Sequence, residues 1–453
     1  MPRLRLNSLS GESFATMASF GAMSIIRLLS SVILTRILYP EAYGIVVMLS
    51  SIVFTLEMLS DIGVTGLMVR SAHGDEPRFI NTLWTLRLIR NLVNFGIFYA
   101  ATPYVAEWYD SPALEGALRA FSWYFILAGL ESMSFMLALR HQNSRIVSFT
   151  DLACTAVSAV FVILYSQVSR DHFGMVYGMV LNRALTTGMS FGFSRHHRHR
   201  LVIDRDARRE LWGFTKYVLP SSMITLVTTQ FDKIIFLKLF NLQLLGLYGL
   251  AISIAGPVES LVVRMSRFVL YARCVGYHRS DPSTVRERYY GENRKLFFLM
   301  SALPALIGGM AGFLVNFLYD PRYAFAATIT LAFAFKAFLV SLASPIEDLL
   351  VARGSTKVVL SGNLIRLCWS IPAALAGYTV WGFKGFLLGV ALESLPTYLY
   401  LLHLQHRSQL LVVRMELAKL GFAATVFSLS WLLSQQLTVY AAPLRALIKA
   451  QLL

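Results

Sequence analysis

Two stretches of the chain decide its architecture: ILTRILYPEAYGIVVMLSSI (33–52) and IFLKLFNLQLLGLYGLAISI (235–254). The second lies over the first when the chain is shifted by 202 residues, the separation of Ile33 and Ile235. The matched pairs are Ile33 and Ile235, Arg36 and Lys238, Gly44 and Gly246, Ser51 and Ser253, Ile52 and Ile254, and Glu57 and Glu259. Identities between apolar segments are common, so the register is the stronger signal. It aligns the first expected helix with the seventh and the second with the eighth, which predicts two parallel repeats.

The composition indicates that most of the chain lies in lipid. Of the 453 residues, 56% are hydrophobic and only 15% are charged, and the mean hydropathy is +0.58. Soluble proteins carry about 25% charged residues, so these values exclude a disordered protein and most soluble enzymes. The three cysteines are scattered, which argues against a disulfide framework or a zinc site. No nucleotide, hydrolase or metalloprotease motif is present, and we expect no cofactor and no metal.

Apolar stretches of about 20 residues recur along the whole chain, as a hydrocarbon core of about 30 Å requires of helices. We therefore expect an all-α polytopic membrane protein. The N-terminus lacks a short apolar region with a cleavage site, so no removed signal peptide is expected. The expected helices are 13–37, 42–69, 79–104, 114–139, 146–168, 172–193, 213–239, 243–266, 296–319, 323–346, 357–379 and 383–405. A further run covers 416–434, and the tail at 437–453 is either a fourteenth span or a surface helix, which gives 12–14 transmembrane helices.

Most of the net charge of +16 is explained by the orientation of the chain in the membrane. With a cytoplasmic N-terminus, 24 Lys and Arg residues fall in loops on the cytoplasmic side. The opposite loops carry only Arg170, Arg322 and Lys384. The excess of cations in cytoplasmic loops fixes topology in membrane proteins, so the N-terminus is expected inside. The same count argues against a nucleic-acid partner, because membrane lipids account for the basic loops.

The duplication predicts two six-helix lobes related by pseudo-two-fold symmetry. We expect an N-terminal lobe at 1–196, a basic cytoplasmic connector at 197–212, a C-terminal lobe at 213–407 and an extra helix or helices at 408–453. The second lobe is richer in proline within its expected helices, which is consistent either with bending during transport or with static kinks. These prolines are Pro220, Pro257, Pro304, Pro345, Pro372 and Pro396, whereas Pro103 and the other prolines of the first lobe fall at expected ends or loops.

The opening stretch also resembles a known family. An Arg closes the first helix, a Pro-acidic-x-aromatic-Gly turn follows, and Asp-aliphatic-Gly ends the second helix; these are Arg36, Pro40, Glu41, Tyr43, Gly44, Asp61 and Gly63. The pattern resembles the oligosaccharide flippases of the multidrug/oligosaccharidyl-lipid/polysaccharide exporter superfamily. An echo appears in TQFDKIIF (229–236) and LGLYGLA (245–251), and LRHQNSRIVSFTDL (139–152) resembles the exopolysaccharide branch.

The resemblance implies a V-shaped bundle with a central cavity in the bacterial inner membrane. It implies transport by alternating access of undecaprenyl-diphosphate-linked oligosaccharide, with a proton or sodium ion as a possible coupling ion. A polysaccharide polymerase and export machinery are further candidate partners. Related drug exporters carry a coupling carboxylate in the first helix. Here that helix carries Arg27 and no acid near mid-span, which favours an anionic substrate over a drug cation.

Cations near mid-span are the candidate substrate ligands, because a charge at the centre of a membrane helix costs about 2.5–3.5 kcal/mol on insertion scales. Arginine suits a diphosphate best, since its planar fork matches phosphate oxygens. The first candidates are Arg27 and Arg264; Arg366, Arg183, Lys336, Arg87 and Arg90 follow. Buried acids nearly balance these cations in number, so structural ion pairs and snorkelling are the alternative interpretation for each.

Acids of the two repeats are candidates for ion coupling or gating. Glu57 and Glu259 occupy matching positions and either bind a coupling ion or pair with Arg27 and Arg264. Asp61, which ends the second helix, suits a helix-end or gating role, and Asp232 is the corresponding candidate on the seventh helix.

The other function classes fit the sequence less well. A drug exporter is not supported, because the first helix lacks the coupling carboxylate of such exporters. A membrane polymerase or glycosyltransferase would need a sizeable outer loop or an acidic catalytic loop. The outer loops here are short and the long loops are basic. We therefore expect a transporter and not an enzyme, while a scaffold role beside a polymerase stays open.

The orientation can be tested by cysteine labelling on a background in which Cys154, Cys274 and Cys368 are replaced. A single cysteine at Glu107 should react with a membrane-impermeant maleimide from outside, and one at Arg205 should react only after permeabilisation. The opposite labelling pattern would contradict the expected topology.

Overall fold

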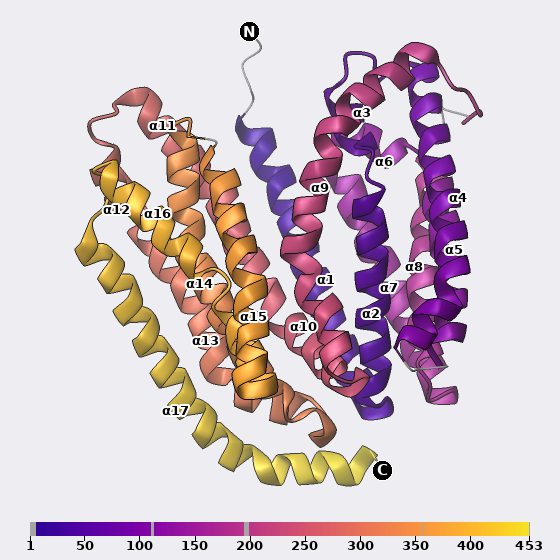
Figure 1. Ribbon diagram of the computed structural model, residues 1–453. Coiled ribbons are helices and arrows are strands. Elements are labelled where there is room, and N and C mark those ends of the chain that lie inside the picture. Colours follow the sequence, from indigo (N-terminus) through magenta and orange to yellow (C-terminus); the bar gives the residue numbers. More distant parts are fainter. Residues whose placement is uncertain (1–5, 110–112, 194–198, 356, 453) are drawn as a thin grey trace. The chain divides into compact units, whose positions relative to one another are not determined.

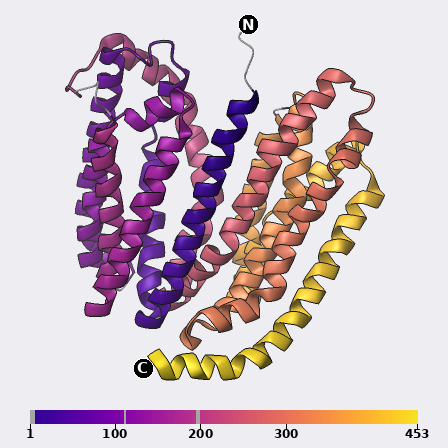
Figure 2. The ribbon, with the colours of Figure 1, turned by 180° about the vertical axis from the view of Figure 1, so that it is seen from behind.

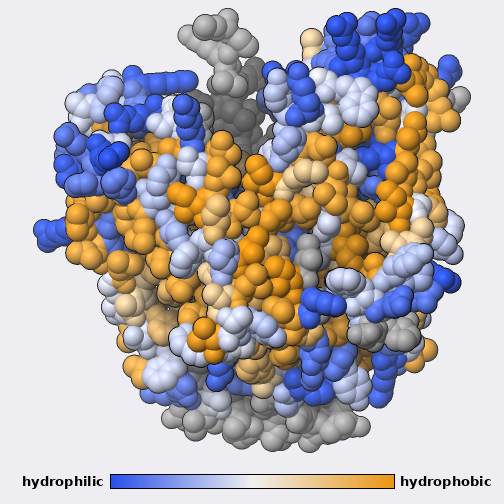
Figure 3. Space-filling model, viewed as in Figure 1, coloured by the Kyte–Doolittle hydropathy of each residue, from blue (hydrophilic) through white to orange (hydrophobic). Residues whose placement is uncertain are grey.

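The computed structural model describes residues 6–109, 113–193, 199–355 and 357–452, and the chain divides into two compact units, Met1–Leu242 and Gln243–Leu453. The described residues form helices and loops without a strand, which confirms the all-α class. In each unit, the face shown in Figure 3 carries apolar side chains along the middle of the helices and hydrophilic ones toward their ends. This distribution is the one that a hydrocarbon layer requires.

The described residues of the first unit form nine helices (Figure 1). They are α1 (Leu6–Ile37), α2 (Pro40–Leu59), α3 (Val64–Arg70), α4 (Pro77–Trp108), α5 (Ala113–Leu130), α6 (Ser134–Arg140), α7 (Ser144–Val168), α8 (Phe173–Gly192) and α9 (Arg205–Leu239). Helix α1 packs against α7, as Figure 2 shows from behind, and α5 packs against both α4 and α8. Helix α9, the seventh in the expected count, packs against α2 and clusters with this unit.

The second unit is built around α13 and α14. Its elements are α10 (Leu242–Met265), a π-helical turn (Ser266–Leu270), α11 (Tyr271–Ser280), α12 (Val285–Glu292), α13 (Arg294–Leu318), a 3-10 turn (Pro321–Tyr323), α14 (Ala326–Ala352), α15 (Lys357–Ala391), α16 (Leu395–Arg407) and α17 (Val413–Leu452). Helix α13 packs against α14 and α17, and α14 also contacts α11, α15 and α16. The run at 416–434 and the tail are one unbroken helix, α17, rather than two.

Eight helical segments of the described chain are long and apolar enough to cross a membrane, or nine with one pair bent by 54°. Helices α4, α8 and α9, with 32, 20 and 35 residues, are long enough to cross a membrane. They are not among these segments because their polar side chains make them less apolar. The 51-residue segment Lys357–Arg407 contains two of the expected helices. Each expected range is therefore occupied by helix, although 42–69 and 114–139 are each broken in two.

Prolines interrupt helices in both units. Pro220, Pro257, Pro304, Pro345 and Pro372 lie inside helices as expected, whereas Pro396 lies in the first turn of α16, where it costs no hydrogen bond. Pro103, expected at a helix end, lies inside α4, which continues to Trp108. The contrast in proline between the two halves is therefore smaller than the sequence predicted.

The connector between α8 and α9 is docked on α4 over its described residues. The backbone N–H groups of Arg200, Val202 and Asp204 donate to side-chain oxygens of Asn81, Thr85 and Thr82 at 3.2, 3.1 and 2.9 Å. The His199 ring stacks on Trp84 with 5.1 Å between ring centroids. Asp204 then caps α9 by accepting from the N–H groups of Asp206 and Ala207. This part of the expected connector is thus held by α4, while 194–198 lie outside the described residues.

The helices of α15 turn back on each other at Trp381 and Gly382, whose backbone angles are not helical. This break confirms the expected boundary between 379 and 383. Gly377 before the break and Gly385 after it lie so close together that a Cβ built on Gly377 would be 2.1 Å from the Gly385 carbonyl oxygen. Small residues allow membrane helices to approach in this way.

Gly377→Ala should therefore destabilise the second unit by about 1–3 kcal/mol, since an added methyl group must push the two backbones apart. Thermal unfolding of the detergent-solubilised protein measures the effect. Gly421→Ala on α17 is the matched control, because a Cβ there meets nothing within 4 Å. Equal melting temperatures for the two variants would contradict the close approach.

Candidate functional site

Three arginines occupy the middle of two helices in the first unit. Arg87 and Arg90 lie on α4 and Arg183 lies on α8. Arg87 and Arg183 are each ten residues beyond the first residue of their helix, about 15 Å along it at 1.5 Å per residue. Such a depth is beyond the reach of water at either surface, so these side chains need partners inside the protein.

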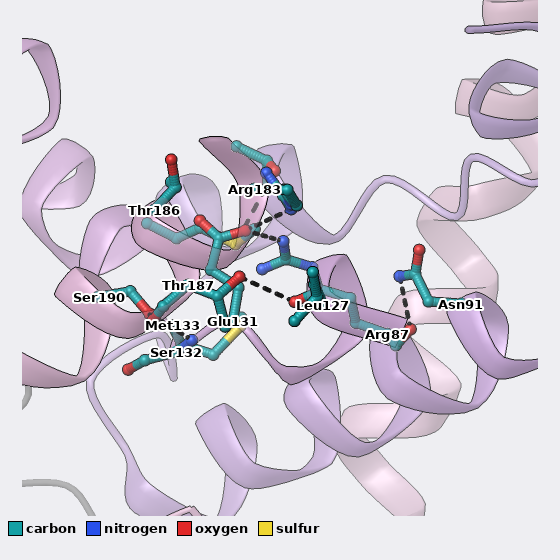
Figure 4. Close-up of polar contacts among 12 residues, drawn as sticks. Arg87, Asn91, Leu127, Glu131, Ser132, Met133, Arg183, Thr186, Thr187 and Ser190 are labelled. Carbon is teal, nitrogen blue, oxygen red and sulfur yellow. Dashed lines mark hydrogen bonds and ion pairs between the residues drawn. The ribbon is translucent and has the colours of Figure 1, made fainter. Parts of the chain in front are cut away.

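Glu131 brings two of the arginines together (Figure 4). The Nη2 atoms of Arg87 and Arg183 both donate to its Oε2 atom, the Arg183 contact being 2.6 Å. The side chains of Arg87 and Glu131 are each 10% exposed, and that of Arg183 is 19% exposed. A carboxylate between two guanidinium groups is a strong, charge-assisted arrangement.

The interactions continue toward α2. The Tyr124 hydroxyl on α5 donates to Glu57 Oε1 at 3.5 Å, and the Arg183 guanidinium lies 5.5 Å from the centre of the Tyr124 ring. Arg90 and Arg183 both interact electrostatically with Glu57. We call this set, Arg87, Arg90, Arg183, Glu57, Glu131 and Tyr124, the Glu131 cluster. Its three cations and two acids leave a formal charge of +1.

Some donors of the cluster are unused. Arg87 Nη1, Arg90 Nε and Arg183 Nε are buried and have no hydrogen-bond partner among the described residues. Buried donors are nearly always paired in native proteins, so unpaired ones require an explanation. Three guanidinium nitrogens in one cluster have the chemistry to bind an anion.

Glu131 sits where a helix is interrupted. Helix α5 ends at Leu130 and α6 begins at Ser134, and the two axes differ by 54°. The freed N–H of Ser132 donates to Ser190 Oγ at 2.9 Å, and the Ser132 hydroxyl lies 2.8 Å from His199 Nε2. Because α8 and the connector satisfy the backbone, the Glu131 carboxylate remains available to the arginines.

Asp61 occupies another break, between α2 and α3, with a different outcome. Its Oδ1 accepts from the N–H of Gly63 at 2.9 Å, and its Oδ2 accepts from Ser222 Oγ on α9 at 2.8 Å. Gly63 has φ +75°, a left-handed conformation that explains glycine in the Asp-x-Gly motif. These contacts support the helix-end role expected for Asp61.

The second unit holds a smaller cluster of similar design, which we call the Glu393 cluster. Glu393 lies at the break between α15 and α16 and is 3% exposed. Lys336 Nζ on α14 lies 2.7 Å from its Oε2, and Arg366 Nε on α15 lies 4.0 Å from its Oε1. Two of the expected cations, Lys336 and Arg366, therefore share one acid.

The remaining candidates lie apart from these clusters or are less buried. Arg27 on α1 has an exposed side chain and interacts electrostatically with Asp151 on α7, whereas Glu57 interacts electrostatically with Arg90 and Arg183. The pairing of Glu57 with Arg27 stays a prediction. Arg264 and Glu259 are half-buried on α10, and Asp232 is 5% exposed with Lys233 Nζ 3.6 Å from its Oδ1.

Glu131 was absent from the candidate ligands, although it joins Arg87 to Arg183. The sequence signal was present, because Glu131 interrupts an apolar stretch at a Glu-Ser dipeptide. Its partners lie 44 and 52 residues away, so the pairing itself could not be read from spacing. Among the described residues, no group of three or more His, Cys, Asp or Glu side chains is arranged to hold a metal ion.

Comparison with known proteins identifies the family. The family model described as polysaccharide biosynthesis protein matches residues 33–328. The chain belongs to this family. The match covers the whole Glu131 cluster, whereas the Glu393 cluster lies entirely beyond it. The chain is therefore a multi-pass membrane protein of a polysaccharide biosynthesis family, as its sequence suggested.

Relatives and a solved structure agree with this assignment. The chain is 21% identical to the teichuronic acid biosynthesis protein TuaB of Bacillus subtilis over 70% of its own length, and it spans 66% of that protein, just under two thirds. It is 20% identical to the lipopolysaccharide biosynthesis protein WzxC of Escherichia coli over 86% of its length and 79% of that protein. The lipid II flippase MurJ, inward closed, has the same fold with a TM-score of 0.65, at 14% identity and coverage of 95% and 99% of the two chains.

The Glu393 cluster gives a direct test of buried pairing. Lys336→Met leaves a buried carboxylate whose other cation is 4.0 Å away, so we expect a loss of about 3–5 kcal/mol in stability. Adding Glu393→Gln should recover much of that loss, because the unpaired charge is then removed. Thermal unfolding of both single variants and the double variant measures the coupling energy. Additive losses would contradict the pairing.

Proposed function

We propose that this chain moves polyprenyl-diphosphate-linked oligosaccharide across the bacterial inner membrane by alternating access. The observation that carries the proposal is the Glu131 cluster, whose three mid-helix arginines keep buried donors without partners among the described residues. A diphosphate crossing a membrane needs such donors, while its polyprenyl tail stays in lipid. The similarity to the lipid II flippase MurJ and to the biosynthesis proteins TuaB and WzxC supports the substrate class.

The arginines of the cluster suit this task by chemistry and by position. A guanidinium group donates two parallel hydrogen bonds to phosphate oxygens and stays charged at any physiological pH. We propose Arg87, Arg90 and Arg183 as the primary ligands of the diphosphate, with Arg27 and Arg264 as ligands at other points of the cycle. Arg366 and Lys336, which lie beside Glu393 in the second unit, are secondary candidates. Movement of the lipid breaks no covalent bond, so the proposal needs no catalytic residue or cofactor.

Loss of a primary ligand should stop transport without unfolding the protein. In a strain whose surface polysaccharide depends on this chain, Arg183→Ala should reduce export at least tenfold, because one charged hydrogen-bonding group is worth about 1.5–3 kcal/mol. Arg27→Ala and Arg264→Ala should also reduce export. Arg119→Ala is the control, since Arg119 pairs with Glu115 on an exposed face of α5 with its side chain 52% exposed. Normal polymer from all three test variants at normal protein levels would contradict the diphosphate assignment.

We further propose that an ion gradient drives the cycle, through a proton or sodium ion at Glu57 or Glu259. Glu57 is the stronger candidate because it belongs to the Glu131 cluster, so a change in its charge would reach Arg90 and Arg183. Asp232, which is buried, is a further candidate, and Asp61 serves as a gate or helix end.

Glu57→Gln and Glu259→Gln test this coupling separately. Transport into proteoliposomes should lose its dependence on the imposed proton or sodium gradient in the variant that removes the coupling acid. The other variant should keep that dependence. If both variants respond to the gradient as the unmodified protein does, the two glutamates have a pairing role only.

A further inference from the structure

The contact between Glu131 and its two arginines has a feature that a purely structural ion pair does not require. Both guanidinium groups donate to one oxygen of the carboxylate, Oε2, while further donors of Arg87, Arg90 and Arg183 stay unpartnered among the described residues. A structural pair would be expected to use both carboxylate oxygens in parallel with one arginine. A single oxygen between two guanidinium groups is instead the environment of one phosphate oxygen in an arginine-lined anion site.

We propose that Glu131 is an internal competitor for the anionic headgroup of the substrate. It holds Arg87 and Arg183 while the site is empty and is displaced when the diphosphate arrives. The inference rests on the proposed function, because it assigns the same arginines to a lipid diphosphate. It goes further by giving a role in substrate exchange to an acid that would otherwise only neutralise charge.

Physical reasoning favours a competitor at this position. Two guanidinium groups without an anion would repel each other in a site that excludes water, so the empty site needs an internal acid. A transporter must also release what it binds, and a carboxylate that competes for the same donors weakens the complex without removing its specificity. The acid thus stabilises the empty site and limits the affinity of the filled one.

The local structure allows the side chain to leave. Because Glu131 lies between two helices, it is not held by a continuous helical turn on both sides. Its neighbours are anchored independently, since Ser132 and Ser134 bond to Ser190 on α8 and Ser132 also contacts His199. The backbone can therefore stay in place while the carboxylate turns away from the arginines.

The second unit has a related arrangement, in which the two cations approach different oxygens of the acid. Glu393 also lies at a helix break, and it also holds two cations that come from two different helices. Its neighbour Ser394 is fully buried. A transporter that passes an anion between cation clusters would need an internal acid in each of them.

Glu131→Gln tests the proposal because it keeps the size and the acceptor oxygen but removes the charge. Full-length protein in nanodiscs is titrated with undecaprenyl diphosphate, and the Kd is compared with that of the unmodified chain. We expect Glu131→Gln to bind at least tenfold more tightly, and to export less polysaccharide in cells because release is slowed. Glu115→Gln, which removes an acid paired with Arg119 on the exposed face of α5, should leave the Kd unchanged.

The direction of the change separates a competitor from a structural pair. Damage to the fold or to the placement of the arginines weakens binding, so weaker or equal binding by a folded Glu131→Gln protein would overturn the proposal. If that variant does not fold, Glu131→Asp keeps the charge on a shorter side chain and should tighten binding about threefold, and an unchanged or larger Kd would overturn it. If the unmodified protein and every variant fold but bind no undecaprenyl diphosphate, the proposed substrate itself is wrong.

Discussion

Lipid supplies no partners for polar groups, and this constraint organises the interior of both units. A charge within an apolar helix needs an opposite charge or polar partners inside the protein, and every interruption of a helix needs new hydrogen bonds. The chain answers both needs at the same places. Asp61, Glu131 and Glu393 each lie where a helix breaks, and each makes contacts with other helices there.

The breaks differ in which groups accept hydrogen bonds from the freed backbone N–H groups. This difference decides whether the acid at the break has a structural role or is available to bind cations. At Asp61 the carboxylate itself accepts from the backbone of Gly63 and from Ser222, so little of it remains for substrate or ion. At Glu131 the serines and His199 take over that task. The carboxylate of Glu131 is then free to bind cations. Whether an acid is structural or functional thus depends on its neighbours more than on its own burial.

Cations at the helix ends have partners of another kind. Arg140, which the charge count assigns to a cytoplasmic loop, donates from Nη1 to the carbonyl oxygens of Met68, Val69 and Ser71 at 3.0, 3.2 and 2.6 Å. It therefore caps the end of α3, where unpaired carbonyl groups favour a positive charge. The same guanidinium group bonds to Asp75 and holds the pKa of that carboxyl below its usual value. Arg140, one of the loop cations that indicate the orientation, thus also stabilises a helix end.

The sequence predicted the helices well because apolar length is a property of each segment alone. It placed the break at 379–383 and the candidate arginines 87, 90 and 183 correctly on long helices. It missed the break at 131–133, since a break of three residues leaves the apolar run uninterrupted, whereas the Asp-x-Gly motif indicated the helix end at Asp61 although the expected range continued to 69. It also could not assign the partners of Arg87 or Glu57, because the choice among several acids depends on distances between helices. The docking of the connector could not be predicted from its residue types either, because its hydrogen bonds to α4 are donated by backbone N–H groups.

That docking explains why the arginines of α4 can be held firmly in so polar a helix. The connector bonds to Asn81, Thr82 and Thr85, within two turns of Arg87, and then leads directly into α9. Helix α9 in turn bonds to the Asp61 break through Ser222 and to Ile62 through Thr215. The described part of the connector thus joins α4 to α9, and α9 is joined to the Asp61 break. These contacts hold the helix that carries Arg87 and Arg90 in place, so that the anion exchange proposed above would require only the carboxylate of Glu131 to move.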